Sequence, residues 1–182
     1  MKISYVLIIF NFFLTSAICQ TENPPYISLG SSYGGGIVFQ IDPTGQHGLI
    51  AAPFDQSHGT CWGNEGWINA AYMDNGKPNT EKIVSFLKEK RRLSCETPAA
   101  WICDTLTLCG FADWYLPSID ELITMNENRK LIGEFILGFY CSSTESNKAN
   151  CWSVKFEPKS KCVSFQSSKL EKGYSVRCIR KF

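Results

Sequence analysis

The pattern of apolar and polar positions divides the chain into a β-rich start, a helical middle and a β-rich end. Near the start, residues 36–41 and 47–52 are rich in strand-forming side chains, and the segment 42–45 between them has turn chemistry, which predicts a β-hairpin. Near the end, four short strand-like segments alternate with polar loops. They predict an antiparallel sheet over residues 139–143, 151–156, 161–165 and 174–180.

The middle of the chain carries helical spacing. Apolar positions follow Asn79 and Thr80, either of which can cap a helix that runs to about Leu93. A second helix is predicted over residues 99–106. Residues 55–79 show neither helical nor alternating periodicity, so we predict a long ordered loop there. A hairpin, a loop, helices and then a terminal sheet give the fold class α+β.

The sharpest local signal is the start of a third helix after Ser118. Ser118 and Glu121 have the spacing of a capping box, in which each side chain accepts a hydrogen bond from a backbone N–H at the start of the helix. Asp120 and Glu121 also suit the positive end of the helix dipole. This pattern explains both Ser118 and Glu121 structurally.

The first 19 residues have the order of a secretory signal: a positive charge at Lys2, an apolar run over residues 3–14, and small residues before a cleavage point after Ala17 or Cys19. The run is too short to cross a bilayer. Residues 20–32, with Pro24 and Pro25, are expected to be an irregular lead-in. No later segment is apolar enough to span a membrane, so a secreted protein is predicted.

Eight cysteines follow the signal, and an even set in an oxidising compartment predicts four disulfides among Cys61, Cys95, Cys103, Cys109, Cys141, Cys151, Cys162 and Cys178. Spacing leaves their connectivity open, and nothing resembles a paired zinc motif, so no metal is expected. The signal holds one of the 18 basic residues and none of the 17 acidic ones. The remainder is formally neutral, which argues against a nucleic-acid partner.

Tryptophan placement suggests where a ligand could stack. Trp101, Trp114 and Trp152 lie in patterns typical of a core, whereas Trp67 stands between small and polar residues in the unpatterned loop. Trp67 is therefore the best candidate for an exposed aromatic side chain.

Six motifs in order along the chain resemble one known family, the Lcl-type C-terminal domain. They are Tyr33-Gly34-Gly35-Gly36-Ile37-Val38-Phe39, Gly45-Gln46-His47-Gly48-Leu49-Ile50-Ala51-Ala52-Pro53, Asp113-Trp114-Tyr115-Leu116-Pro117-Ser118 with Glu121-Leu122, Cys141-Ser142-Ser143-Thr144-Glu145, Trp152-Ser153-Val154-Lys155-Phe156 and Val176-Arg177-Cys178-Ile179-Arg180. The resemblance implies one domain over residues 33–182. It also implies a C-type-lectin-like fold, with two to three helices on a twisted antiparallel sheet.

The resemblance further implies a core position for Trp62, where the family is often aromatic. It also implies a ligand site in a long loop, within residues 55–79 or 141–162. The candidate ligand-binding residues in these segments are Asn64, Glu65, Trp67, Glu145, Asn147 and Asn150. No cofactor is expected. Calcium stays an alternative because Glu145, Asn147 and Asn150 carry oxygen ligands, but the calcium motifs of lectins are absent and a polar turn between two strands is favoured.

The chain departs from the family at Cys141, where members usually carry Trp. Cys141 and Cys151, ten residues apart, suggest that a disulfide replaced an aromatic contact, so this resemblance predicts that they pair.

The function expected from this resemblance is non-enzymatic recognition or adhesion, with a glycan or an extracellular surface protein as partner. Two alternatives stay open. One is a structural component of a matrix or coat, and the other is an enzyme related to the formylglycine-generating enzymes, which share the broader fold and use reactive cysteines. The sequence does not fix the ligand or the oligomeric state.

Overall fold

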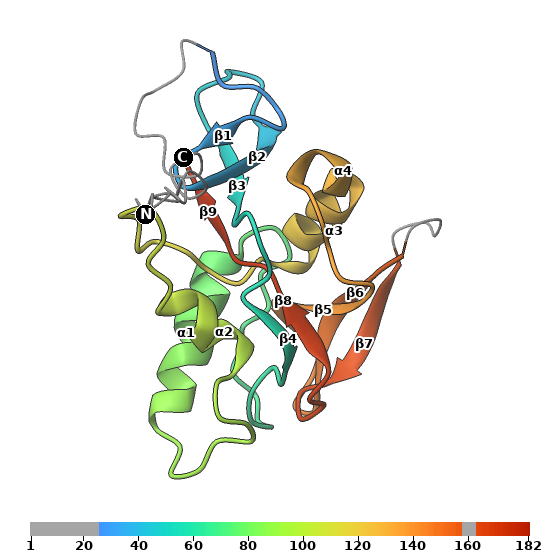
Figure 1. Ribbon diagram of the computed structural model, residues 1–182. Coiled ribbons are helices and arrows are strands. Elements are labelled where there is room, and N and C mark those ends of the chain that lie inside the picture. The colour runs from blue at the N-terminus through green and yellow to red at the C-terminus, as the bar shows by residue number, and fades with distance from the viewer. Residues whose placement is uncertain (1–25, 158–162) are drawn as a thin grey trace, which may run out of the picture.

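The computed structural model describes residues 26–157 and 163–182 and shows an α+β fold with two sheets (Figure 1). The predicted signal peptide, the lead-in before residue 26 and Cys162 lie outside the described residues. The first sheet has the strand order β1-β2-β3-β9, over Ser32–Tyr33, Gly36–Ile41, Gly48–Ala51 and Ile179–Lys181. It contains the predicted hairpin, because β2 pairs antiparallel with β3.

The second sheet has the order β4-β8-β5-β6-β7, over Ser57–Thr60, Tyr174–Val176, Gly138–Glu145, Asn150–Phe156 and Ser164–Ser168. All its pairs are antiparallel except β5 with β8, which meet in parallel at Tyr140 and Ser175. The prediction of one continuous strand over residues 174–180 was wrong. This segment divides between the two sheets because Arg177 and Cys178, between β8 and β9, bond to other parts of the chain, Arg177 to Asp55 and Cys178 to Cys103.

Two further strand predictions need correction. The segment predicted as a loop over residues 55–79 contains β4, whose Ser57–Thr60 pairs with β8. The strand predicted at 161–165 lies instead at Ser164–Ser168. Both errors arise because short polar segments such as β4 become strands only where a neighbouring strand offers partners.

Within the described residues, four helices flank the sheets, over Gly76–Lys88 (α1), Ala99–Asp104 (α2), Ile119–Glu127 (α3) and Arg129–Ile132 (α4). The capping box at Ser118 and Glu121 is confirmed, with both of its hydrogen bonds present. The predicted limits of α1 were wrong, because its N-cap is Asn75 and it ends at Lys88. The second helix ends at Asp104, short of the predicted 106.

The reason for the misplaced start of α1 is that the residues expected to cap it are buried and make tertiary hydrogen bonds. The Asn79 side chain accepts from the Tyr72 N–H at 3.0 Å and donates to the Tyr72 carbonyl at 2.7 Å. Thr80 Oγ1 accepts from the Leu116 N–H at 3.1 Å. Both residues therefore lie within the helix and not at its start, and their side chains bond the helix to neighbouring segments.

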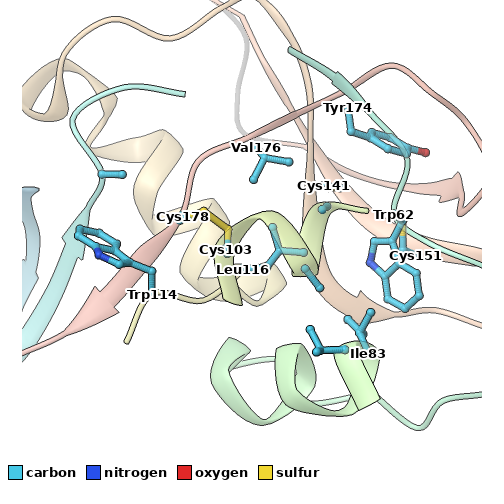
Figure 2. Close-up of a cluster of buried hydrophobic side chains, with 14 of the residues drawn as sticks. Trp62, Ile83, Cys103, Trp114, Leu116, Cys141, Cys151, Tyr174, Val176 and Cys178 are labelled. Carbon is cyan, nitrogen blue, oxygen red and sulfur yellow. A yellow bond between two sulfur atoms is a disulfide. The ribbon is translucent and has the colours of Figure 1, made fainter. Parts of the chain in front are cut away.

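Buried side chains form two clusters. The first cluster packs helices α1 and α2 against the sheets. It contains Trp62, Ile83, Leu116, Val176 and the Cys103–Cys178 disulfide (Figure 2). The other joins both sheets to α3 and α4. Trp62 and Trp114 are core residues as predicted, whereas Trp101 and Trp152 are half-buried.

The cysteines only partly follow prediction. Cys61 bonds to Cys95 and Cys103 to Cys178, and Cys109 is disulfide-bonded. The prediction that Cys141 pairs with Cys151 was wrong, because both are free and buried, and four disulfides therefore do not form among the eight cysteines.

The register of β5 and β6 explains why these two cysteines stay apart. Cys141 faces Ser153, and Cys151 faces Glu145, with a bulge between. Their positions are thus diagonal across the two strands rather than directly opposite, and diagonal neighbours lie up to roughly 7–8 Å apart. A disulfide needs about 3.5–4.5 Å between the Cβ atoms.

Candidate functional site

The candidate site is the segment between β4 and α1, residues 61–75. It begins at the Cys61–Cys95 disulfide and at Trp62, whose buried indole N–H donates to the Ser142 carbonyl at 2.8 Å. A few residues later the chain reaches the surface, where Trp67 is 57% exposed. The predicted exposure of Trp67 is confirmed.

A buried ion pair fixes the backbone on both sides of Trp67. Lys169 Nζ lies 2.5 Å from Glu145 Oε1, and both side chains are almost completely buried. Lys169 Nζ also donates to the Gly66 carbonyl at 2.8 Å. Glu145 accepts hydrogen bonds from the N–H groups of Ile68 and Asn69, at 3.0 Å and 2.8 Å.

Gly66 shows how closely this loop is packed against α1. Its φ is +139°, and a Cβ placed there would come within 2.7 Å of the Phe86 ring. The Gly66 N–H donates to the Lys148 carbonyl at 2.9 Å, which ties the loop to the turn between β5 and β6. A side chain at this position would push the loop off its support.

A second aromatic side chain, Tyr72, lies beyond Trp67 in the same segment and is half exposed. Lys82 of α1 places its ammonium 4.8 Å from the centre of the Tyr72 ring and donates to the Asn69 carbonyl at 2.8 Å. The segment therefore presents two aromatic side chains on a backbone that side chains from other elements hold in place.

The other candidate residues in this segment differ in accessibility. Asn64 accepts from the Ser94 N–H at 3.2 Å and donates to the Arg92 carbonyl at 3.0 Å, so its amide joins the loop to the chain after α1. Glu65 is exposed. Of the two, only Glu65 presents its functional group to a ligand.

The candidates Glu145, Asn147 and Asn150 lie around the turn between β5 and β6. Asn147 Oδ1 accepts from the N–H groups of Ala149 and Asn150, both at 2.9 Å, which is the geometry of a closed polar turn. Glu145 is engaged with Lys169 and the Trp67 loop. Among residues 26–157 and 163–182, no group of three acidic, histidine or cysteine side chains could hold a metal ion.

The two loop regions in which a ligand site was expected are therefore in contact, but they contribute differently to the candidate site. The 141–162 region supplies Glu145 and the Lys148 carbonyl as supports, and the 55–79 region supplies the exposed aromatic surface. Sequence reasoning missed Lys169, which is 0% exposed and central to the arrangement. No signal marked it, because a single lysine in a polar segment is usually solvated.

A second polar cluster surrounds an open hollow of about 470 Å³ lined by Asp55, His58 and Arg177. Arg177 Nε donates to Asp55 Oδ1 and the Tyr140 hydroxyl donates to Asp55 Oδ2, each at 2.6 Å. Burial and the adjacent Asp55 raise the pKa of Tyr140. Because both Asp55 oxygens already hold internal partners, we assign this cluster to stability.

The two free thiols are unsuited to nucleophilic chemistry. Burial raises the pKa of Cys141 well above its usual range and raises the pKa of Cys151 to about 12. A cysteine nucleophile acts as the thiolate, which neither residue forms near neutral pH.

Comparison with solved structures gives a likeness of fold, whereas the comparisons with family models and curated proteins give no match. Among solved structures, the chain is similar to a fimbrial protein from Bacteroides ovatus, with a TM-score of 0.51 and 15% identity. The match covers 72% of this chain and 35% of that one, so it spans about a third of the fimbrial protein.

At this identity the likeness bears on the fold alone. The disulfides indicate an extracellular protein, because such bonds persist in oxidising compartments. None of the described helices is long and apolar enough to cross a membrane.

Proposed function

We propose that this protein is a secreted, non-enzymatic recognition domain that binds an extracellular glycan or surface protein through the Trp67 loop. The observation that carries the proposal is the exposed Trp67 indole on a backbone held by the buried Lys169–Glu145 pair. An exposed aromatic ring on a fixed backbone gives a large contact area and spares the cost of ordering the loop on binding. A glycan is the ligand that the resemblance to the Lcl-type family implies.

The fold supports the same proposal at a coarser level. We propose a C-type-lectin-like domain, in which the segment before α1 serves as the ligand-bearing loop. The fimbrial protein that the chain resembles is a surface component by its name. The raised pKa values of Cys141 and Cys151 count against a role for these two thiols in catalysis.

The test is a printed glycan array probed with the disulfide-intact protein, with calcium and with a chelator. Trp67→Ala should remove most of the signal, and Trp67→Phe should retain part of it because a ring can still stack. Phe54→Ala is the matched control, since Phe54 is also an exposed aromatic residue but lines the other hollow. It should leave the signal unchanged.

The outcomes separate the alternatives. Equal signals with calcium and with chelator fit a site built on stacking and hydrogen bonds, as the occupied Glu145 implies. If Trp67→Ala does not alter the glycan signal, the glycan binds at another place on the protein. Absence of any glycan signal, together with Trp67-dependent capture of extracellular proteins, would support the protein partner, and absence of both would contradict the proposal.

A further inference from the structure

Strand β7, Ser164–Ser168, forms an edge of the second sheet and pairs with β6 on one side (Figure 1). No strand among the described residues pairs with its other side. The register with β6 is continuous from Ser164 to Ser168, without a bulge. The strand therefore presents a regular row of backbone groups at the edge.

The hydrogen-bonding pattern shows which groups face outward. The Lys169 N–H donates to the Ala149 carbonyl at 2.9 Å, one step beyond the pair Ser168 and Asn150 in the same register. Hydrogen-bonded pairs alternate along antiparallel strands, so Phe165 and Ser167 bond to β6, and Ser164, Gln166 and Ser168 point away from it.

One of these outward residues already has a partner. The Ser168 carbonyl accepts the Tyr174 hydroxyl at 2.7 Å. The backbone N–H and carbonyl groups of Ser164 and Gln166 remain at the edge. These two residues define a short, specific docking register.

The other described edges lack this regularity. Strand β1 has two residues, and β4 has a register shift between Ser57 and Thr60. Strand β9 is joined to Tyr115 by an isolated bridge at Ile179. Natural sheets protect their edges with charges, prolines or bulges, and Ser-Phe-Gln-Ser-Ser has none of these.

We propose that β7 pairs antiparallel with β7 of a second copy of this chain, with Phe165 opposite Phe165 across a twofold axis. In this register Ser164 of each copy exchanges both backbone hydrogen bonds with Gln166 of the other, so the groups left open at the edge are used. The pairing is closed by symmetry and does not extend into fibres. The strand itself carries no charge, so its own side chains add no repulsion between the two copies.

The side chains support the same register. Phe165 is 39% exposed and makes an edge contact with Phe139, with 5.4 Å between ring centres. Directly opposite residues of a non-hydrogen-bonded pair approach most closely, and aromatic pairs stabilise such positions. Pairing would cover Phe165 and the neighbouring exposed Val163. The contact is small, so the dimer should be weak and depend on concentration.

Cross-linking tests the register. Phe165→Cys should form a disulfide-linked dimer under mild oxidation, because Cα atoms at a non-hydrogen-bonded pair lie within disulfide range. Gln166→Cys is the matched control and should stay monomeric on non-reducing gels, since Ser164 of the second copy lies opposite. Cross-linking by Gln166→Cys but not by Phe165→Cys would overturn the proposal.

Sedimentation velocity tests the pairing itself. Gln166→Pro removes an outward N–H and leaves the ladder to β6 intact, so it should weaken dimerisation by about tenfold or more while circular dichroism stays unchanged. Gln166→Ala keeps the N–H and should dimerise like the wild type. A wild-type protein that stays monomeric at high protein concentration, or a Gln166→Pro variant that dimerises like the wild type, would overturn the proposal.

Discussion

Two buried glutamates fix two different stretches of backbone, and they do so in different electrostatic settings. Glu121 accepts the N–H groups of Ser118 at 2.8 Å and Gly76 at 2.9 Å, and the Tyr115 hydroxyl at 3.0 Å. No ion pair with Glu121 is present within residues 26–157 and 163–182. Glu145 holds the Trp67 loop and has a buried counter-ion, Lys169.

The two carboxylates differ in what offsets the cost of their burial. Burial raises the pKa of Glu121, and the hydrogen bonds from Ser118, Tyr115 and Gly76 only partly oppose it. Glu145 instead depends on a lysine that lies on another segment. The start of α3 bonds to Ser118, which is close in sequence, and also to Thr144 and Met73 from other segments. The candidate binding loop instead requires Lys169, near the end of the chain, to be folded into place.

The largest effect is expected from Lys169→Met. It leaves Glu145 buried without its counter-ion, and breaking such a pair costs about 3–5 kcal/mol of the free energy of unfolding. Urea denaturation at pH 7 measures this loss. The exposed Lys172→Met is the matched control and should change the free energy by less than about 0.5 kcal/mol.

A double variant tests whether the charges of Glu145 and Lys169 stabilise each other. Glu145→Gln with Lys169→Met removes both charges, so it should recover part of the stability lost by Lys169→Met alone. If the double variant is as unstable as the sum of the two single variants, the two charges are not coupled.

A comparable loss is expected from Glu121→Ala. It leaves the buried N–H groups of Gly76 and Ser118 without their acceptor, and each unsatisfied group costs about 1–3 kcal/mol. Thermal and urea unfolding at pH 7 measure the loss. Asp120→Ala, at the exposed neighbouring position of α3, should cost clearly less.

A pH series separates the two glutamates further. Because the folded-state pKa of Glu121 is raised above its ordinary value of 4.5, the folded protein holds a proton that the unfolded chain has lost. Wild-type stability relative to Glu121→Gln should therefore fall as pH rises from 4.5 through the folded-state pKa. Urea unfolding of both proteins from pH 4 to 7 gives this difference, and a difference that rises with pH would contradict it.

The smallest effect on stability is expected from Trp67→Ala. More than half of this side chain is exposed, so its removal should change the free energy of unfolding by about 0.5 kcal/mol or less. Trp62→Ala should cost about 3–5 kcal/mol because that side chain is fully buried. A large loss of stability in Trp67→Ala would mean that Trp67 supports the fold rather than a ligand.

Local patterns predicted the elements whose causes lie close in sequence. The hairpin of β2 and β3 follows from its turn residues, and the start of α3 follows from Ser118 and Glu121. Predictions failed where a distant segment decides the outcome. Asn79 and Thr80 lie inside α1, where they bond to Tyr72 and Leu116. Cys141 stays a free thiol because the pairing of β5 with β6 places Ser153, and not Cys151, opposite it.

The candidate site divides in the same way. The sequence by itself determined that Trp67 lies in an unpatterned polar segment, where a large aromatic residue has no periodic core to join, and its exposure follows from that. Only the tertiary structure decided what holds it there. Glu145 ends β5 and Lys169 follows β7, and both become buried only when these segments and the loop before α1 pack together.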